Sequence, residues 1–93
     1  MPSDEIIETM ARAIYNGRNG PGCTSWGRLP GRHKAPYLGD ARAALSAAEA
    51  AGWVMVPKEP TLTMRRAGAE ERDRPDSGAA VSSIYGAMIE ARP

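Results

Sequence analysis

The chain has 93 residues, a net charge of +1 and a single cysteine. This length corresponds to one small domain, which we expect to span residues 1–93. The sequence contains no run of 18 apolar residues, so we expect no membrane-spanning helix. Its first ten residues are acidic where an export signal would be basic, and we therefore expect a cytoplasmic protein.

Large apolar side chains are scarce. Sixteen of the apolar residues are alanine, and phenylalanine is absent, so one copy of the chain can bury only a thin core. Small domains compensate for a thin core with cross-links or by self-association. Cys23 has no second cysteine with which to form an internal disulfide, and we expect it to be an ordinary free thiol. The sequence therefore predicts a homo-oligomer.

The first predicted element is a helix with Ser3 as its N-cap and acidic residues in its first turn. Asn16 and Gly17 are expected to end it, because glycine readily adopts the left-handed conformation of a helix C-cap. Apolar residues recur at helical spacing and predict one buried face, made of Ile6, Ile7, Met10, Ala11 and Ile14.

Residues 17–34 are rich in glycine and proline and are expected to form a long loop, with room for a short helical turn near residues 30–34. Trp26 and Leu29 are its large apolar residues, and their favoured role is to pin the loop to the core. An alternative is that Trp26 faces a ligand.

A second helix is expected from Pro36 to Ala51, since proline suits the first position of a helix. Gly52 and Trp53 would follow as the C′ and C″ residues of a Schellman ending. Residues 53–57 are expected to be extended, either as a buried connector or as a strand that pairs with another subunit. The buried stripe of this helix is expected to contain Tyr37, Ala41, Ala44, Leu45 and Ala48.

The last third of the chain predicts two more helices. Thr61 is the expected N-cap of one, and Gly68 inside it indicates close packing against a neighbouring backbone. Ser77 is the expected cap of the other, which ends near Ala91 and has the clearest apolar stripe, Val81, Ile84, Tyr85, Met88 and Ile89. The expected fold class is therefore all-α, a compact bundle of three to four short helices with a long Gly/Pro-rich loop after the first.

Positive charge is concentrated in residues 11–45, which carry a net +5. Arginine binds phosphate in a bidentate manner, a helix N-terminus attracts anions, and an aromatic face stacks on a base. The sequence therefore predicts a site for a phosphate-bearing small molecule. The alternative is that the aromatic side chains are core anchors and the cations only solvate a loop. The candidate ligand-binding residues are Trp26, Arg28, Arg32, His33, Lys34 and Tyr37, with Arg12 and Arg42 adding charge from the flanking helices.

Catalytic patterns are poorly represented. Cys23 and His33 lie ten residues apart with no evident third group to orient them. A zinc site would need three or four closely spaced ligands, and the glycine-rich loop lacks the Gly-Lys-Ser/Thr of a phosphate-binding Walker motif. We therefore expect a non-catalytic protein without a metal or cofactor. The Ala-rich second helix and the modest net charge also argue against duplex DNA binding.

Four segments together resemble a set of small helical proteins encoded by bacteriophages and prophages: ARAIY, WGRLPGRHKAPYLGDARAAL, EPTLTMRRAGAE and IYGAMIEA. The shared pattern is W-x-x-L-P before Y-L-x-x-A-R-A-A-L, followed by E-P-T-x-x-M, and it extends from Met10 to Ala91. The resemblance implies an accessory protein made in the cytoplasm of a bacterial host. It assigns no activity and no catalytic residues.

Small phage accessory proteins often act by binding, and some sequester nucleotide signals of bacterial immunity. The leading hypothesis is a non-catalytic anti-defence sponge that binds a small anionic, nucleotide-like ligand in a pocket between subunits. The alternative is a protein-interaction module that inhibits or scaffolds a host or phage protein, such as a bacterial defence protein. Nucleic-acid binding is a third hypothesis, and it predicts an affinity that falls steeply with salt.

Overall fold

The computed structural model describes residues 4–74 and 80–93. All regular elements in these residues are helical: α1 (Asp4–Asn19), a short 3-10 helix η1 (Trp26–Arg28), α2 (Gly31–Ala50), α3 (Leu62–Asp73) and α4 (Val81–Glu90). The expected all-α class is thus confirmed. Ser3 and Ser77, the expected caps of the first and fourth helices, lie outside the described residues.

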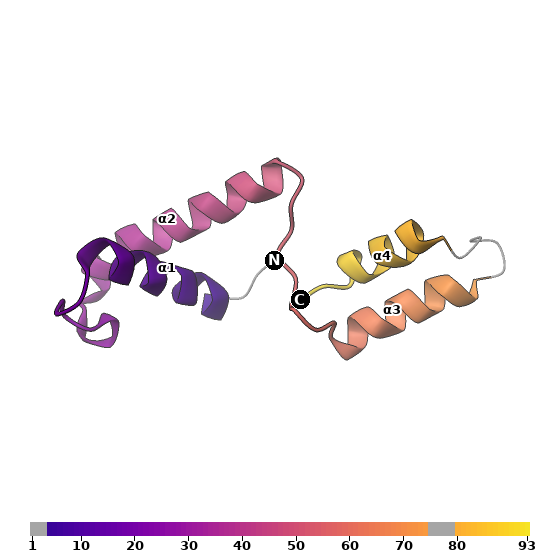
Figure 1. Ribbon diagram of the computed structural model, residues 1–93, viewed down its shortest axis with the longest axis horizontal. Coiled ribbons are helices and arrows are strands. Elements are labelled where there is room, and N and C mark those ends of the chain that lie inside the picture. The colour runs from indigo at the N-terminus through magenta and orange to yellow at the C-terminus, as the bar shows by residue number, and fades with distance from the viewer. Residues whose placement is uncertain (1–3, 75–79) are drawn as a thin grey trace. The chain divides into compact units, whose positions relative to one another are not determined.

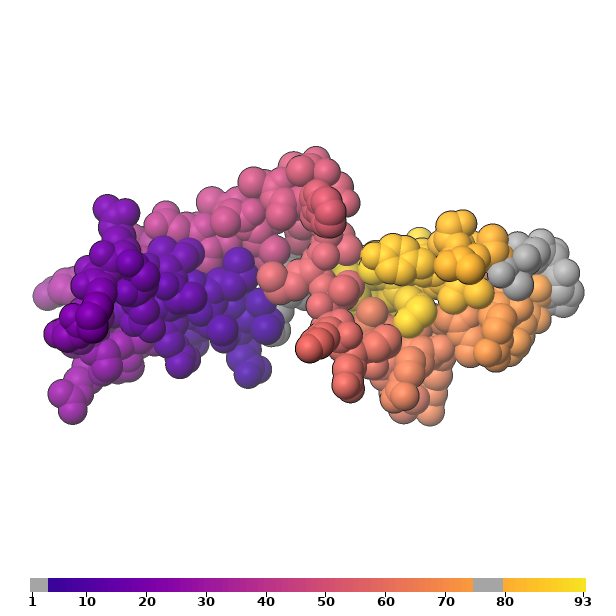
Figure 2. Space-filling model, viewed as in Figure 1, coloured from indigo at the N-terminus to yellow at the C-terminus, as the bar shows by residue number. Residues whose placement is uncertain are grey.

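The chain divides into two compact units, of which one ends at Val54 and the other begins at Met55. The N-terminal unit contains α1, η1 and α2, and the C-terminal unit contains α3 and α4. In each unit the two α-helices run in opposite directions (Figure 1), and they pack against each other (Figure 2). A single domain over residues 1–93 stays a prediction.

The core of the N-terminal unit is formed by one face each of α1 and α2, closed by η1. Its buried residues are Ile7, Ala11, Tyr15, Trp26, Ala41 and Leu45. Leu29 is half-buried against this cluster, so Trp26 and Leu29 pin the chain to the core as expected. Ala44 and Ala48 are exposed, contrary to expectation, because α2 packs mainly against α1 and that contact covers the face that carries Ala41 and Leu45.

Both expected boundaries of the loop are wrong. Helix α1 continues through Gly17 to Asn19, and Gly20, with a φ of +73°, is the residue that leaves the helix. The amide of Gly20 donates to the carbonyl of Asn16 at 2.9 Å, which closes the last turn. Helix α2 begins at Gly31, so Pro36 lies inside it rather than at its first position. The helix tolerates Pro36 at the loss of one backbone hydrogen bond, because a proline nitrogen cannot donate to the carbonyl of residue 32.

The end of α2 is a Schellman motif, as expected. Gly52 has a φ of +95°, its amide donates to Glu49, and the amide of Trp53 donates to Ala48 at 3.0 Å. Beyond this point residues 53–57 form neither a helix nor a strand, and their side chains are exposed, so the expected buried connector is wrong. Trp53 is 73% exposed.

The C-terminal unit begins with the cap expected for α3, where the Thr61 hydroxyl accepts a hydrogen bond from the amide of Met64 at 3.2 Å. Met64 and Gly68 are its buried residues. A Cβ atom placed on Gly68 would lie 2.8 Å from Cγ and 3.0 Å from Sδ of Met88. The close approach that Gly68 indicated is therefore real, but its partner is a side chain of α4 and not a backbone.

Candidate ligand-binding site

Three aromatic rings organise the segment between α1 and α2. Tyr15, Trp26 and Tyr37 pack together at centroid distances of 5.2 to 6.3 Å, each pair edge-on or tilted. The Tyr15 hydroxyl donates to the carbonyl of Thr24, which ties the loop to α1. The Asn19 amide donates both to the Tyr15 carbonyl and to the Tyr37 hydroxyl. These contacts fix where Trp26 enters the core.

Burial has an electrostatic consequence for Tyr15. Desolvation raises the pKa of its hydroxyl above the ordinary value of 10.0, and the neighbouring Cys23 adds to this rise through a hydrogen bond and charge repulsion. The hydroxyl is therefore neutral at physiological pH and serves as a hydrogen-bond donor inside the unit.

Trp26 is 5% exposed, so its ring belongs mainly to the core. Two polar side chains nevertheless interact with the Trp26 side chain. Its indole Nε1 donates to Oε1 of Glu8 at 3.1 Å, and Nζ of Lys34 lies 5.5 Å from the ring centroid in a cation–π contact. Glu8 of α1 and Lys34 of α2 therefore both lie against Trp26.

A hollow of about 410 Å³ opens where these side chains meet. Its volume lies within the range typical of small-molecule sites, about 300 to 1,000 Å³. Two cations and one carboxylate line it, which gives its rim a net positive charge. The lining residues are Glu8, Arg12, Asn16, Ser25, Trp26, Gly27 and Lys34.

The hollow contains three of the eight residues that the sequence singled out, Trp26, Arg12 and Lys34. They come together within one chain, so a second subunit is not needed to assemble them. Tyr37 is half-buried in the aromatic cluster instead. The other four are exposed and do not line the hollow: Arg28, Arg32, His33 and Arg42.

Four residues that line the hollow were not among the residues singled out from the sequence. Two of them, Ser25 and Gly27, flank Trp26 in the chain. The other two are Glu8 and Asn16. They lie one turn before and one turn after Arg12 on α1, at i−4 and i+4, so all three share one helical face. Polar residues at this spacing on an amphipathic helix are the sequence pattern from which these two residues could have been predicted. What the spacing cannot show is that Trp26 and Lys34 lie opposite that stripe.

The start of α2 adds to the positive potential of this region. Arg32, His33 and Lys34 lie in its first turns, no acidic residue accompanies them there, and the carbonyl of Pro30 accepts from the amides of residues 33 and 34. Cations at a helix N-terminus oppose the helix dipole, and an anion relieves that repulsion. The expected association of cations with a helix start thus holds, although the helix starts five residues earlier than expected.

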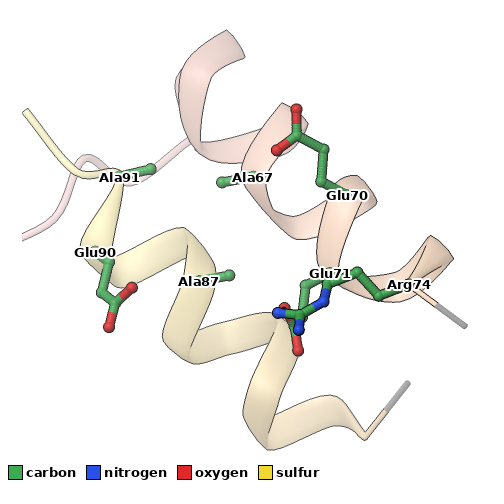
Figure 3. A pocket seen from close by; sticks show the side chains of 7 residues that line it. All are labelled: Ala67, Glu70, Glu71, Arg74, Ala87, Glu90 and Ala91. Atoms are coloured by element: carbon green, nitrogen blue, oxygen red, sulfur yellow. The ribbon is translucent and has the colours of Figure 1, made fainter. Parts of the chain in front are cut away.

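A second hollow, of about 350 Å³, lies between α3 and α4 of the C-terminal unit (Figure 3). Glu70, Glu71 and Glu90 line it with a floor of alanines, and its one cation, Arg74, is paired with Glu71 at 3.2 Å. This hollow is acidic, so it does not suit an anionic ligand.

Among residues 4–74 and 80–93, no three His, Cys, Asp or Glu side chains are grouped so that they could hold a metal ion. In the same residues, no helix combines the length and the apolar character that crossing a membrane requires. Comparisons of this chain with protein-family models, with curated proteins and with solved structures found no match.

Proposed function

We propose that this protein binds and sequesters a small anionic, nucleotide-like ligand, and that the hollow beside Trp26 is its site. The observation that carries the proposal is the convergence of Arg12 from α1 and Lys34 from α2 on one hollow beside a fixed aromatic wall. Cations on two separate helices, one of them held against a rigid ring, form a partly preorganised receptor for a phosphate group.

The remaining lining residues favour a nucleotide over a bare phosphate. Asn16 and Ser25 offer both donors and acceptors, and Glu8 offers a carboxylate that accepts from amino groups of a base or hydroxyls of a ribose. Trp26 is too deeply buried to stack its full face on a base. We therefore assign it the role of a wall that positions Lys34 and Glu8.

The proposed setting is that of a phage accessory protein in the cytoplasm of a bacterial host, acting against nucleotide-based defence. This role requires tight binding, and the residues that line the hollow supply charge and hydrogen bonds. Self-association of the chain belongs to the same proposal.

Isothermal titration calorimetry against cyclic dinucleotides and ADP-ribose derivatives tests the proposal. We expect binding with about 1:1 stoichiometry per chain, and an affinity that weakens with added salt because exposed charges are screened. The ligand should be recovered unchanged after prolonged incubation. The absence of heat with every one of these nucleotides, using folded protein, would overturn the proposal.

Charge-removing variants locate the site. Arg12→Gln and Lys34→Gln should each weaken binding by about tenfold or more, which is the loss of one charge-assisted hydrogen bond. Arg42→Gln is the matched control, since Arg42 is exposed on α2 but does not line the hollow, and it should bind as the parent does. Equal affinity in all three variants would exclude the hollow as the site.

A second candidate function is favoured by one observation. Trp53, Val54, Met55 and Val56 form an exposed apolar run between α2 and α3. Consecutive exposed large apolar residues are typical of segments that bind another protein. The second candidate is therefore a module that inhibits or scaffolds a host or phage protein. In that case a pull-down from lysate should recover one stoichiometric partner. Trp53→Ser should abolish this recovery and leave nucleotide binding unaffected.

A further inference from the structure

Helix α4 is apolar on more of its surface than α3 can cover. The nine residues Val81–Ile89 include no charged side chain. An apolar helix face is typical of a position that a neighbouring element covers. Yet all of α4 is described, and none of its residues is buried in this unit.

The uncovered side of α4 is a continuous stripe. Val81, Tyr85 and Ile89 follow one another at i, i+4 and i+8, so they share one line along the helix. Val81 is 83% exposed and Tyr85 is 62% exposed, whereas Ile89 is half-buried. Helices of 12 and 10 residues are too short to be stable alone, and within this unit they fully bury only Met64 and Gly68. The unit therefore needs further apolar cover.

The stripe is complementary to itself. Tyr85 lies at its midpoint, so a two-fold axis beside Tyr85 sets Val81 of one copy against Ile89 of the other, twice, and pairs the two tyrosine rings. Pairs of rings of this kind are favourable beyond their buried area when they meet edge to face or offset.

The charge pattern of α3 selects the same arrangement. Residues 62–68 carry a net +2, from Arg65 and Arg66, and residues 69–74 carry a net −1. Two copies packed antiparallel bring the basic half of one α3 near the acidic half of the other, while a parallel arrangement would bring the two basic halves together. An antiparallel dimer thus agrees with both helices of the unit.

We infer that the Val81–Tyr85–Ile89 stripe is the interface of a homodimer, in which two C-terminal units form an antiparallel four-helix bundle. The occupant of the stripe is a second copy of this chain. The inference is independent of the ligand site, because every residue that lines the hollow beside Trp26 belongs to the N-terminal unit.

Val81→Asp tests the interface without threatening the fold. Val81 is the first residue of α4, where an aspartate is favoured by the helix dipole, so the substitution should not unfold a monomer. In the dimer the substitution buries one carboxylate from each copy. We therefore expect the dissociation constant of the dimer to rise by about 100-fold or more. Ser46→Asp is the matched control, since Ser46 is exposed on α2 of the N-terminal unit and receives the same charge.

The measurement is sedimentation equilibrium of the 9.9 kDa chain across a range of concentrations, with circular dichroism to verify helicity. We expect a dimer for the parent and for S46D, and a monomer for V81D and for a second variant, Tyr85→Asp. A monomeric parent would overturn the inference, as would a parent dimer that survives both V81D and Y85D. Dissociation by S46D as well would also contradict it, because the effect would then not be specific to the stripe.

Discussion

Gly68 offers the sharpest test of how α3 and α4 pack. Replacing it with alanine introduces a Cβ atom 2.8 Å from Cγ and 3.0 Å from Sδ of Met88, closer than carbon atoms normally approach. Overpacking of this kind costs about 1 to 3 kcal/mol. Alanine is favoured over glycine in a helix by about 1 kcal/mol, which offsets part of that cost. We therefore expect Gly68→Ala to reduce the free energy of unfolding by about 1 kcal/mol.

Gly86 provides the matched control on the opposite helix. A Cβ atom at Gly86 meets nothing within 4 Å, so Gly86→Ala gains the helix propensity without a clash. It should raise the free energy of unfolding by about 0.5 to 1 kcal/mol. The two variants make the same chemical change and are expected to act in opposite directions.

Urea unfolding followed by circular dichroism at 222 nm measures both variants at one fixed protein concentration. We expect the two midpoints to lie on opposite sides of the parent midpoint, because Met88 lies against Gly68 and nothing lies against Gly86. A Gly68→Ala variant as stable as Gly86→Ala would refute it, because Met88 would then be free to move aside and α3 would not be held close to α4.

Four further predictions concern separate features of the chain. Pro36→Ala should stabilise the N-terminal unit by about 1 to 3 kcal/mol, since it restores a donor inside α2, and thermal unfolding would show no gain if the helix instead began at Pro36. Thr61→Ala should cost about 1 kcal/mol through loss of the α3 cap, measured by urea unfolding. In Trp53→Phe the remaining fluorescence comes from buried Trp26, so it should be blue-shifted and shielded from acrylamide. In Trp26→Phe it comes from exposed Trp53, so it should be red-shifted and readily quenched. The reverse pattern would contradict the burial of these residues. The pKa of Tyr15 is raised in the folded chain, so its stabilising contribution is fully present below about pH 10 and is lost as the pH rises through the raised pKa. Thermal melts of Tyr15→Phe should show a weaker loss of stability above pH 10 than melts of the parent, and equal pH profiles would argue against this linkage.

The helices themselves were predictable from the sequence because their signals are local. The Thr61 cap and the Gly52 ending depend on residues within one or two turns, and both are present as expected. The ends that were wrong involve residues with two permitted roles. Gly17 is tolerated inside α1 because Gly20 supplies the turn, and Pro36 is tolerated inside α2 because only one hydrogen bond is lost.

The site was predictable only in part, because it depends on contacts between distant segments. The basic character of residues 28–34 was evident, but only Lys34 of its cations reaches the hollow. That selection follows from the burial of Trp26, whose ring fixes Lys34 and Glu8 around it. Composition shows how many cations a segment has, and packing alone decides which of them converge.

In the proposed site, Arg12 and Lys34 bind one anionic nucleotide in the hollow beside Trp26. The most direct measurement is a calorimetric titration of the parent chain, Lys34→Gln and Arg42→Gln with the best-binding nucleotide, at two salt concentrations. We expect salt-sensitive binding that is retained in Arg42→Gln and weakened by about tenfold or more in Lys34→Gln. Binding that is equally strong in Lys34→Gln, or no binding by the folded parent, would contradict it.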